Sequence, residues 1–198
     1  MPAKQQRGAA TVDRVLAAAL QVFAEPGRHG FTVSAVAEAA DVSLGSIYHH
    51  FGSFDGLAAH LYDRCLDHLC DALIAELSQA RTARAGIHAL VSAYLRFTAD
   101  HRDEALFLHG SAHSGRLAAQ AAEIRAFKAE RLTAVADRLR PHLDAGTVER
   151  LPAPVLDVLV LGPVEEAARR WLSGAYDLDL DAAAQLLPDR IWRSLRPD

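Results

Sequence analysis

The stretch FTVSAVAEAADVSLGSIYHHF, residues 31–51, decides the fold. Its pattern predicts two short helices, 33–40 and 44–50, separated by a turn of three residues. Thr32 and Ser43 precede the two helices, and hydroxyl residues are favoured as helix N-caps. Two short helices joined by a tight turn form the helix-turn-helix, whose second helix enters the DNA major groove. The same spacing also fits a three-helix core that only closes on itself, so spacing alone leaves both interpretations open.

Helical periodicity extends from this stretch in both directions. Apolar side chains recur at helical spacing, glycine and proline fall in clusters between the segments, and strand-like alternation is absent. The sequence therefore predicts an all-α fold. We expect a three-helix helix-turn-helix domain with an N-terminal arm at 1–55 and a helical bundle for ligand binding and dimerisation at 56–198. The predicted helices are 11–25, 33–40, 44–50, 55–79, 86–100, 103–109, 116–140, 153–174 and 180–196.

Two prolines fall inside the last two predicted helices. Pro163 and Pro188 each remove a helix hydrogen bond, so each is expected to kink or split its helix.

Composition excludes several classes of protein. The chain has 198 residues and a net charge of −4, which argues against binding polyanions over the whole surface but not through a local patch. Cys65 and Cys70 are its only thiols, and on a helix they point about 140° apart, so a local disulfide is not expected. No apolar run of about 18 residues and no signal peptide occur, which predicts a cytoplasmic protein without membrane spans.

Between Leu16 and Leu57, many positions carry the residue types of a known pattern, with no insertion or deletion between them. This stretch resembles the DNA-binding region of the tetracycline-repressor (TetR) family of bacterial transcription regulators. After residue 58 the chain resembles the family in architecture, and LGPVEEAARRWLSG at 161–174 looks like the family helix that packs across the dimer. The matching positions are Ala19–Glu25, Gly27, Thr32, Val33, Val36, Ala37, Ala40, Val42, Ser43, Gly45, Ile47, Tyr48, His50, Phe51, Ser53 and Leu57.

The resemblance implies a homodimer that places two reading helices in successive major grooves of an inverted-repeat operator in double-stranded DNA. It also implies a small-molecule effector, apolar or amphipathic, that releases a repressor from that operator by shifting the fourth helix. In the family, base contacts correspond here to Leu44, Gly45, Ser46 and His49, and phosphate contacts to Thr32, Tyr48 and His50. The DNA-binding residues that we predict are Lys4, Arg7, Thr32, Ser43, Leu44, Gly45, Ser46, Tyr48, His49 and His50.

Three positions depart from the family pattern. Phe54 stands where a lysine is usual, Asp41 where a glycine is usual, and Arg28 where an aromatic residue is usual. Residues 1–51 carry four basic and four acidic side chains, so the predicted DNA-binding domain is formally neutral. We therefore expect about two to four counterions released per subunit and a shallow salt dependence. Lys4 and Arg7 are expected in a flexible arm that reaches the minor groove.

The bundle after residue 58 is rich in aromatic and apolar side chains. These side chains either line an effector cavity between helices or only fill the core, and the pattern leaves both open for each residue. The candidate ligand-binding residues are Tyr62, Leu66, Tyr94, Phe97, Phe107, Phe127 and Trp171.

A metal site is not predicted. His109 and His113 are four residues apart with His101 nearby, but Gly110 is expected to interrupt the helix that would align them. No motif of a cofactor site occurs either, so no cofactor is expected.

The segment before Gly174 is predicted to have a charged and an apolar face. Glu165 with Arg169 and Glu166 with Arg170 are spaced for i, i+4 ion pairs. The opposite face packs inward or across a dimer, and both interpretations remain open. The apolar residues concerned are Val160, Val164, Ala167, Ala168, Trp171, Ile191, Trp192 and Leu195.

Enzymes are the alternative class. The sequence has no nucleophile elbow, phosphate-binding loop, dinucleotide fingerprint or zinc-protease motif. HGSAHSG at 109–115 brings serine and histidine together, but without a carboxylate to orient the histidine. We therefore predict a regulator and no enzyme. A further alternative is a helical protein that has lost DNA binding and acts through protein contacts.

Overall fold

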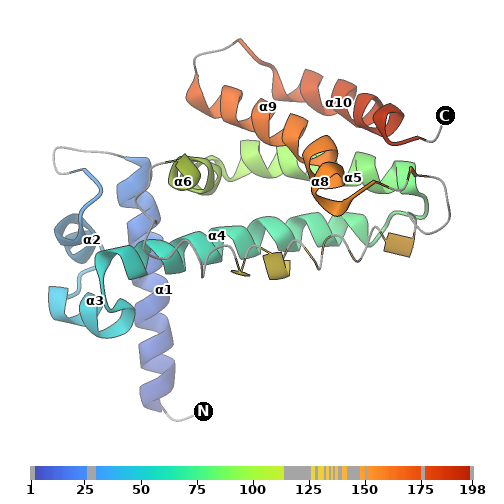
Figure 1. Cartoon of the computed structure of the whole chain (residues 1–198). Helices are drawn as coiled ribbons and strands as arrows, with labels where there is room; N and C mark the ends of the chain where they lie inside the picture. The colour runs from blue at the N-terminus through green and yellow to red at the C-terminus, as the bar shows by residue number, and fades with distance from the viewer. Residues whose placement is uncertain are drawn as a thin grey trace. The chain divides into compact units, whose positions relative to one another are not determined.

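The computed structural model is built from helices (Figure 1). It describes residues 3–25, 30–113, 126–127, 129–131, 133, 135, 137, 140–141, 148–149, 151–174 and 177–196. Throughout these residues no strand occurs, which confirms the predicted all-α class. The helices are α1 (Ala3–Ala24), α2 (Val33–Ala39), α3 (Leu44–Phe51), α4 (Phe54–Leu77), α5 (Ala83–Asp100), α6 (Arg102–His113), α8 (Ala153–Val160), α9 (Gly162–Ser173) and α10 (Leu180–Ser194).

The chain forms two compact units. Unit 1 comprises Met1–Leu66 and Asp103–Lys128, and unit 2 comprises Asp67–Arg102 and Ala129–Asp198. The long helix α4 supplies residues to both units. The units thus divide α4 near its middle, whereas the functional boundary at 55/56 predicted from the sequence stays a prediction.

Unit 1 contains the three-helix core that the sequence predicts. Helix α1 contacts α2, and α2 contacts α3 (Figure 1). Side chains from all three helices and from the start of α4 are fully buried, because each helix is apolar on one face only. The most deeply buried of these residues are Val15, Ala19, Val36, Ile47 and Leu57.

The N-terminal arm differs from the prediction. We expected Lys4 and Arg7 to lie in a flexible arm, but α1 begins at Ala3 and includes both positions. The expectation was wrong because alanine, lysine, glutamine and arginine are strong helix formers, and a single glycine, Gly8, does not end such a helix.

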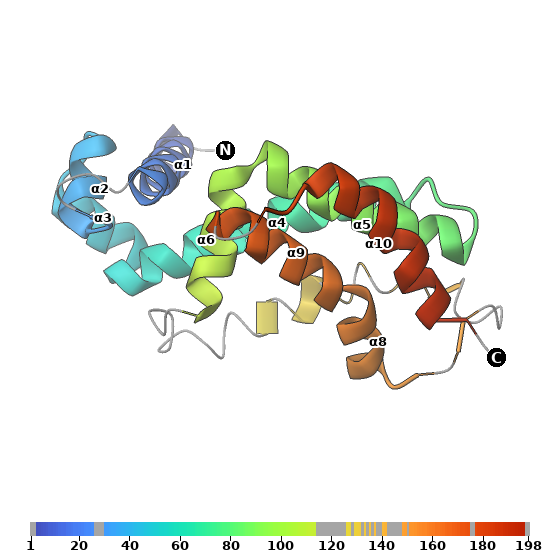
Figure 2. The same ribbon diagram turned by 90° about the horizontal axis from the view of Figure 1, so that it is seen from above.

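In unit 2, α10 lies along α5 and also contacts α9 and α8 (Figure 2). A charged cluster joins the two helices at the surface. Asp189 of α10 accepts hydrogen bonds from Arg84 at 2.8 Å and His88 at 2.9 Å, both on α5. These bonds hold the pKa of the Asp189 carboxyl below its usual value, with Arg84 as the largest cause and His88 the next.

The apolar residues 160–172 and 191–195 pack mainly into unit 2 itself. Val164, Ala168 and Leu195 are completely buried within the chain, and Val160 and Ile191 nearly so. The alternative left open by the sequence is therefore decided for these residues, which belong to the core of the single chain. Ala167 is also buried, whereas Trp171 and Trp192 are half-buried.

Three residues that were expected to interrupt or kink helices, Gly110, Pro163 and Pro188, differ in their effect on the fold. Helix α6 continues through Gly110 to His113, so the predicted interruption is wrong. One exposed glycine costs a helix only about 1 kcal/mol, which the rest of the helix offsets. At Pro163 the predicted split is confirmed, since α8 ends at Val160 and α9 begins at Gly162, whereas α10 runs on through Pro188. The predicted helix 116–140 falls largely outside the described residues.

Within the part of the chain that the structure describes, no helix combines the length and the apolar character that crossing a bilayer needs.

Candidate nucleic-acid interface

Helices α2 and α3 are both fixed by hydroxyl caps. The Ala35 amide donates to Oγ1 of Thr32 at 3.3 Å, and the Ser46 amide donates to Oγ of Ser43 at 3.1 Å. Each cap satisfies an amide that the helix start leaves without a carbonyl partner. Thr32 and Ser43, predicted as DNA contacts, thus have a local structural role, and the hydroxyl hydrogen of each can still be donated elsewhere.

Helix α3 has one buried and one exposed face. Ile47 and Phe51, one helical turn apart, are buried with exposed fractions of 0% and 6%. Leu44 and Tyr48 on the other face are exposed by 44% and 47%, although both are large and partly apolar. Gly45 is exposed beside them.

The two histidines of α3 differ in burial. His49 is exposed and His50 is half-buried, with their ring centroids 5.2 Å apart. Ser46 is half-buried. The predicted base-facing residues Leu44, Gly45 and His49 therefore lie on the open surface of α3, while Ser46 and His50 lie toward its edges.

The turn between α2 and α3 contains a left-handed residue. Asp41 has φ 51°, a conformation that glycine adopts without cost and that aspartate tolerates better than most residues. The Asp41 and Val42 amides donate to Glu38 and Ala37 carbonyls at 3.1 and 3.0 Å, which closes α2. This backbone geometry explains why the TetR family, which the sequence resembles, usually has a glycine at the position of Asp41.

Phe54 belongs to an aromatic cluster that sequence reasoning missed. Its ring lies 5.0 Å from that of Phe31. Phe31 also lies 5.5 Å from Phe23 of α1, and Phe23 lies 4.9 Å from Phe107 of α6. A half-buried aromatic ring therefore stands where the TetR family usually has a lysine. The signal was present in the sequence as four phenylalanines, but their spacing of 8, 23 and 53 residues follows no helical period.

Of the four basic residues at 1–51, the structure describes the side chain of one, Arg14. The side chains of Lys4 and Arg7 and all of Arg28 lie outside the described residues. Arg14 is exposed on α1, beside Asp13. Arg64 of α4 donates from Nη1 to the Asp13 carbonyl at 3.2 Å, which ties α4 to α1 within unit 1.

The candidate effector residues fall in both units. Tyr62, Leu66 and Phe107 are buried in unit 1, and Tyr94 and Phe97 are buried in unit 2. Phe127 and Trp171 are half-buried. Phe107 packs in the aromatic cluster of unit 1. The Trp171 ring lies 5.7 Å from the Arg102 guanidinium, a cation–π contact that joins α9 to the start of α6. That these residues line one cavity stays a prediction.

Unit 2 exposes large apolar side chains on α8 and α10, helices that contact each other. Val155 and Val158 of α8 are exposed by 44% and 66%, and Leu186 of α10 by 62%. We call these three residues the α8–α10 apolar surface. The sequence left open a dimer surface on neighbouring residues of the same region, most of which are core.

The charged face of α9 differs in part from the prediction. Glu166 accepts hydrogen bonds from Arg170 at 2.6 Å and from Arg169 at 2.8 and 2.7 Å. The Glu166–Arg170 pair is therefore confirmed, whereas Arg169 pairs with Glu166 and not with Glu165. These bonds, from Arg170 first and Arg169 second, lower the pKa of the Glu166 carboxyl.

The fold and this surface define a helical protein with an N-terminal helix-turn-helix. Residues 15–61 match the family model described as bacterial regulatory proteins, tetR family. The resemblance seen in the sequence is thus confirmed: this segment is the N-terminal domain of the TetR family. A search of curated proteins finds no match.

Solved structures share the fold over nearly the whole chain. A TetR family transcription regulator from Marinobacter aquaeolei VT8 has a TM-score of 0.79 at 19% identity, covering 98% of this chain and 100% of that one. The transcriptional regulator FadR from Bacillus subtilis, solved in complex with stearoyl-CoA, has a TM-score of 0.74 at 20% identity, covering 93% and 99%. A protein with unknown function from Rhodococcus sp. RHA1 has a TM-score of 0.76 at 22% identity, covering 94% and 96%.

Proposed function

We propose that the protein is a homodimeric transcriptional repressor that binds an inverted-repeat operator through α3 and is released by a small apolar or amphipathic ligand. The observation that carries this proposal is the exposure of Leu44, Gly45, Tyr48 and His49 above a buried Ile47 and Phe51. Such a helix offers its outer face to the major groove while its inner face stays anchored. A protein that binds genomic DNA in bacteria acts in the cytoplasm.

Selection of duplexes from a random pool by the purified ligand-free protein at low salt tests DNA binding. We expect an inverted repeat whose half-sites lie about one helical turn apart. The recovered duplex is then titrated with Tyr48→Ala and with Ser78→Ala, a control at an exposed position in the turn after α4. We expect weakening only for Tyr48→Ala. If neither the wild type nor Phe54→Lys recovers any duplex, the alternative is favoured, a helical protein that acts through protein contacts.

The dimer is supported by the α8–α10 apolar surface, because isolated soluble chains rarely leave several large apolar residues of neighbouring helices open to water. Val158→Glu is expected to give a monomer in light scattering. Leu44→Glu places the same charge on an apolar residue of α3 and is expected to stay dimeric while losing the operator. A dimeric Val158→Glu protein would remove α8 from the interface.

The ligand is proposed to act through α4, since this one helix begins beside α3 and contributes to both units. Shifting α4 changes the separation of the two reading helices, and a differential affinity of about 1.4 kcal/mol already gives a tenfold change in operator affinity. Stearoyl-CoA, the molecule bound to Bacillus subtilis FadR, is the first probe, with free coenzyme A as its control. A ligand that binds without altering operator affinity would end the coupling hypothesis.

A further inference from the structure

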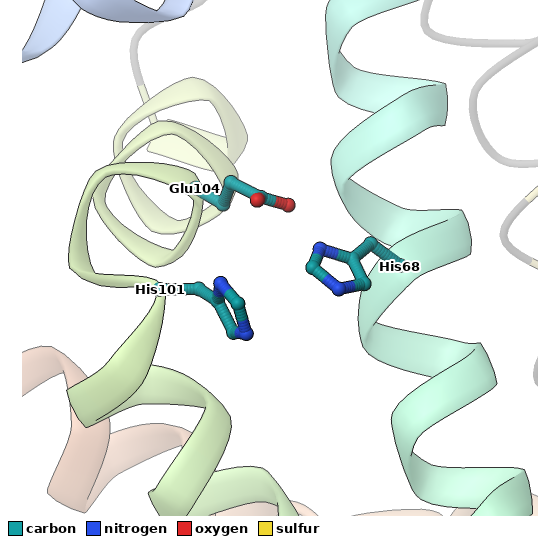
Figure 3. A group of neighbouring side chains, drawn as sticks. All are labelled: His68, His101 and Glu104. Atoms are coloured by element: carbon teal, nitrogen blue, oxygen red, sulfur yellow. The ribbon is translucent and has the colours of Figure 1, made fainter.

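Two histidines of unit 2, separated by 33 residues in the chain, come together beside one buried aromatic ring. His68 lies on α4 and His101 caps the C-terminus of α5, and their ring centroids are 4.5 Å apart. Figure 3 shows the two imidazoles side by side, and it also labels Glu104, which follows His101 by three residues in the chain.

Phe97 packs against both rings. Its own ring is 4% exposed and lies 5.2 Å from His68 and 4.8 Å from His101. The His101 amide also donates to the Phe97 carbonyl at 2.8 Å. Because both imidazoles pack against the same buried group, the fold already meets part of the entropic cost of holding them close together.

The donor atoms suit a late transition metal. A ring nitrogen of His68 lies within 4.8 Å of one of His101, and His68 is exposed to solvent. A tetrahedral ion with bonds of about 2.0–2.1 Å brings two such nitrogens to about 3.3 Å, a change that rotation of the exposed ring can supply. Neutral imidazole is a preferred ligand of Zn²⁺, Ni²⁺ and Cu²⁺ and a poor one of Mg²⁺ or Ca²⁺.

We propose that His68 and His101 together bind one divalent late transition-metal ion such as Zn²⁺, with oxygen ligands completing its coordination. The sequence did not indicate this pair, because the histidines that it aligned, His109 and His113, lie on α6. The proposal is independent of the proposed DNA binding, so either one can fail without the other.

The test is calorimetric titration of the full-length metal-free protein with Zn²⁺, together with visible absorption of its Co²⁺ complex. We expect one ion per chain, and at least a tenfold loss of affinity in His68→Ala and in His101→Ala. His60→Ala is the matched control, since His60 is also exposed on α4 but contacts the Gly56 carbonyl and Phe51 instead. This control is expected to bind Zn²⁺ as the wild type does.

The proposal is overturned if no stoichiometric binding occurs, if His68→Ala and His101→Ala bind like the wild type, or if His60→Ala loses affinity equally. Circular dichroism of each variant separates loss of the ligand from loss of the fold. His101→Gln, which keeps a polar side chain of similar size, is expected to lose Zn²⁺ as well.

Discussion

Phe54 at the start of α4 packs against Phe31 just before α2, with ring centroids 5.0 Å apart and planes inclined by 51°. The contact links the entry of the helix-turn-helix to its exit inside unit 1. A lysine at this position would place a cation at the helix N-terminus, which faces a DNA phosphate in the proposed operator complex. The protein has aromatic packing there instead, so packing and DNA affinity are expected to respond in opposite directions to substitution.

Phe54→Lys is expected to lower the free energy of unfolding by about 1–2 kcal/mol through loss of the aromatic contact. One added phosphate contact per subunit is expected to make the slope of log affinity against log salt steeper by about 0.9 per subunit. Urea unfolding and anisotropy titrations over a salt series measure both effects. Phe54→Leu, the uncharged control, is expected to lose part of the stability and leave the slope unchanged.

Gly56→Ala is expected to destabilise the protein by about 2–4 kcal/mol, like other substitutions that force backbone shifts. A Cβ at Gly56 would clash with the Phe51 carbonyl oxygen. Gly45 is the matched control, since it also lies in a first helical turn but its Cβ would meet its nearest atom, Ser43 Oγ, at 3.8 Å. Thermal unfolding of Gly45→Ala should therefore show no loss, and an equal loss in both variants would refute the steric argument.

Asp41→Gly is expected to leave stability nearly unchanged, because relief of the left-handed backbone and the greater freedom of glycine in the unfolded chain offset each other. Asp41→Val is expected to cost about 1–2 kcal/mol, since a β-branched residue is strained at φ 51°. Chemical denaturation distinguishes the two. Equal stabilities would show that the turn relaxes to another conformation.

Asp189→Asn tests the link between α5 and α10 as a function of pH. The pKa of Asp189 is depressed by Arg84 and His88. Its contribution to stability is therefore fully present above the carboxyl's ordinary pKa of 3.8 and is lost as the pH falls through the lower folded value. Melting temperatures of variant and wild type should differ at pH 6 and converge below pH 3.8. Asp71→Asn, an exposed carboxylate of α4, is the control.

Both thiols are expected to resist labelling in the folded protein. Burial, and secondly the charge of Glu104, raise the pKa of Cys65 to about 12, so its reactive thiolate is scarce at neutral pH. Cys70 is completely buried. A colorimetric thiol reagent at pH 8 should react only slowly with the native protein. In urea, where the chain is unfolded, it should react rapidly with both cysteines. Fast reaction of the native protein would mean that α4 opens locally.

The sequence predicted the helix-turn-helix to within one residue at each boundary, because its limits are set locally. Thr32 and Ser43 cap the helices through hydrogen bonds to amides three residues away, and such short-range chemistry is visible in a sequence. The start of α1 was missed since no capping residue marks it. The end of α6 was predicted too early, at Gly110, because the cost of one glycine in a helix is smaller than the stabilisation that the rest of the helix supplies.

Features set by tertiary packing could not be predicted. The Phe31–Phe54 contact and the His68–His101 pair join residues 23 and 33 positions apart, and no period relates them. The burial of individual apolar side chains could not be predicted from the sequence either. The apolar patterns of α9 and α10 indicated an inner face, but only the fold shows that Val164 and Leu195 are core whereas Val158 and Leu186 are open.

The close approach of Gly56 to the Phe51 carbonyl sets a rule for recombining this protein with others. Helices α3 and α4 are separated by two residues, and the Gly56 amide donates to Oγ of Ser53 at 2.9 Å. A chimera that exchanges the DNA-reading module should therefore be joined inside α4, after Tyr62, so that both parents' turn and first helical turn remain intact. A chimera cut at Gly52 would take the end of α3 from one protein and the first turn of α4 from another, although these two segments pack closely against each other.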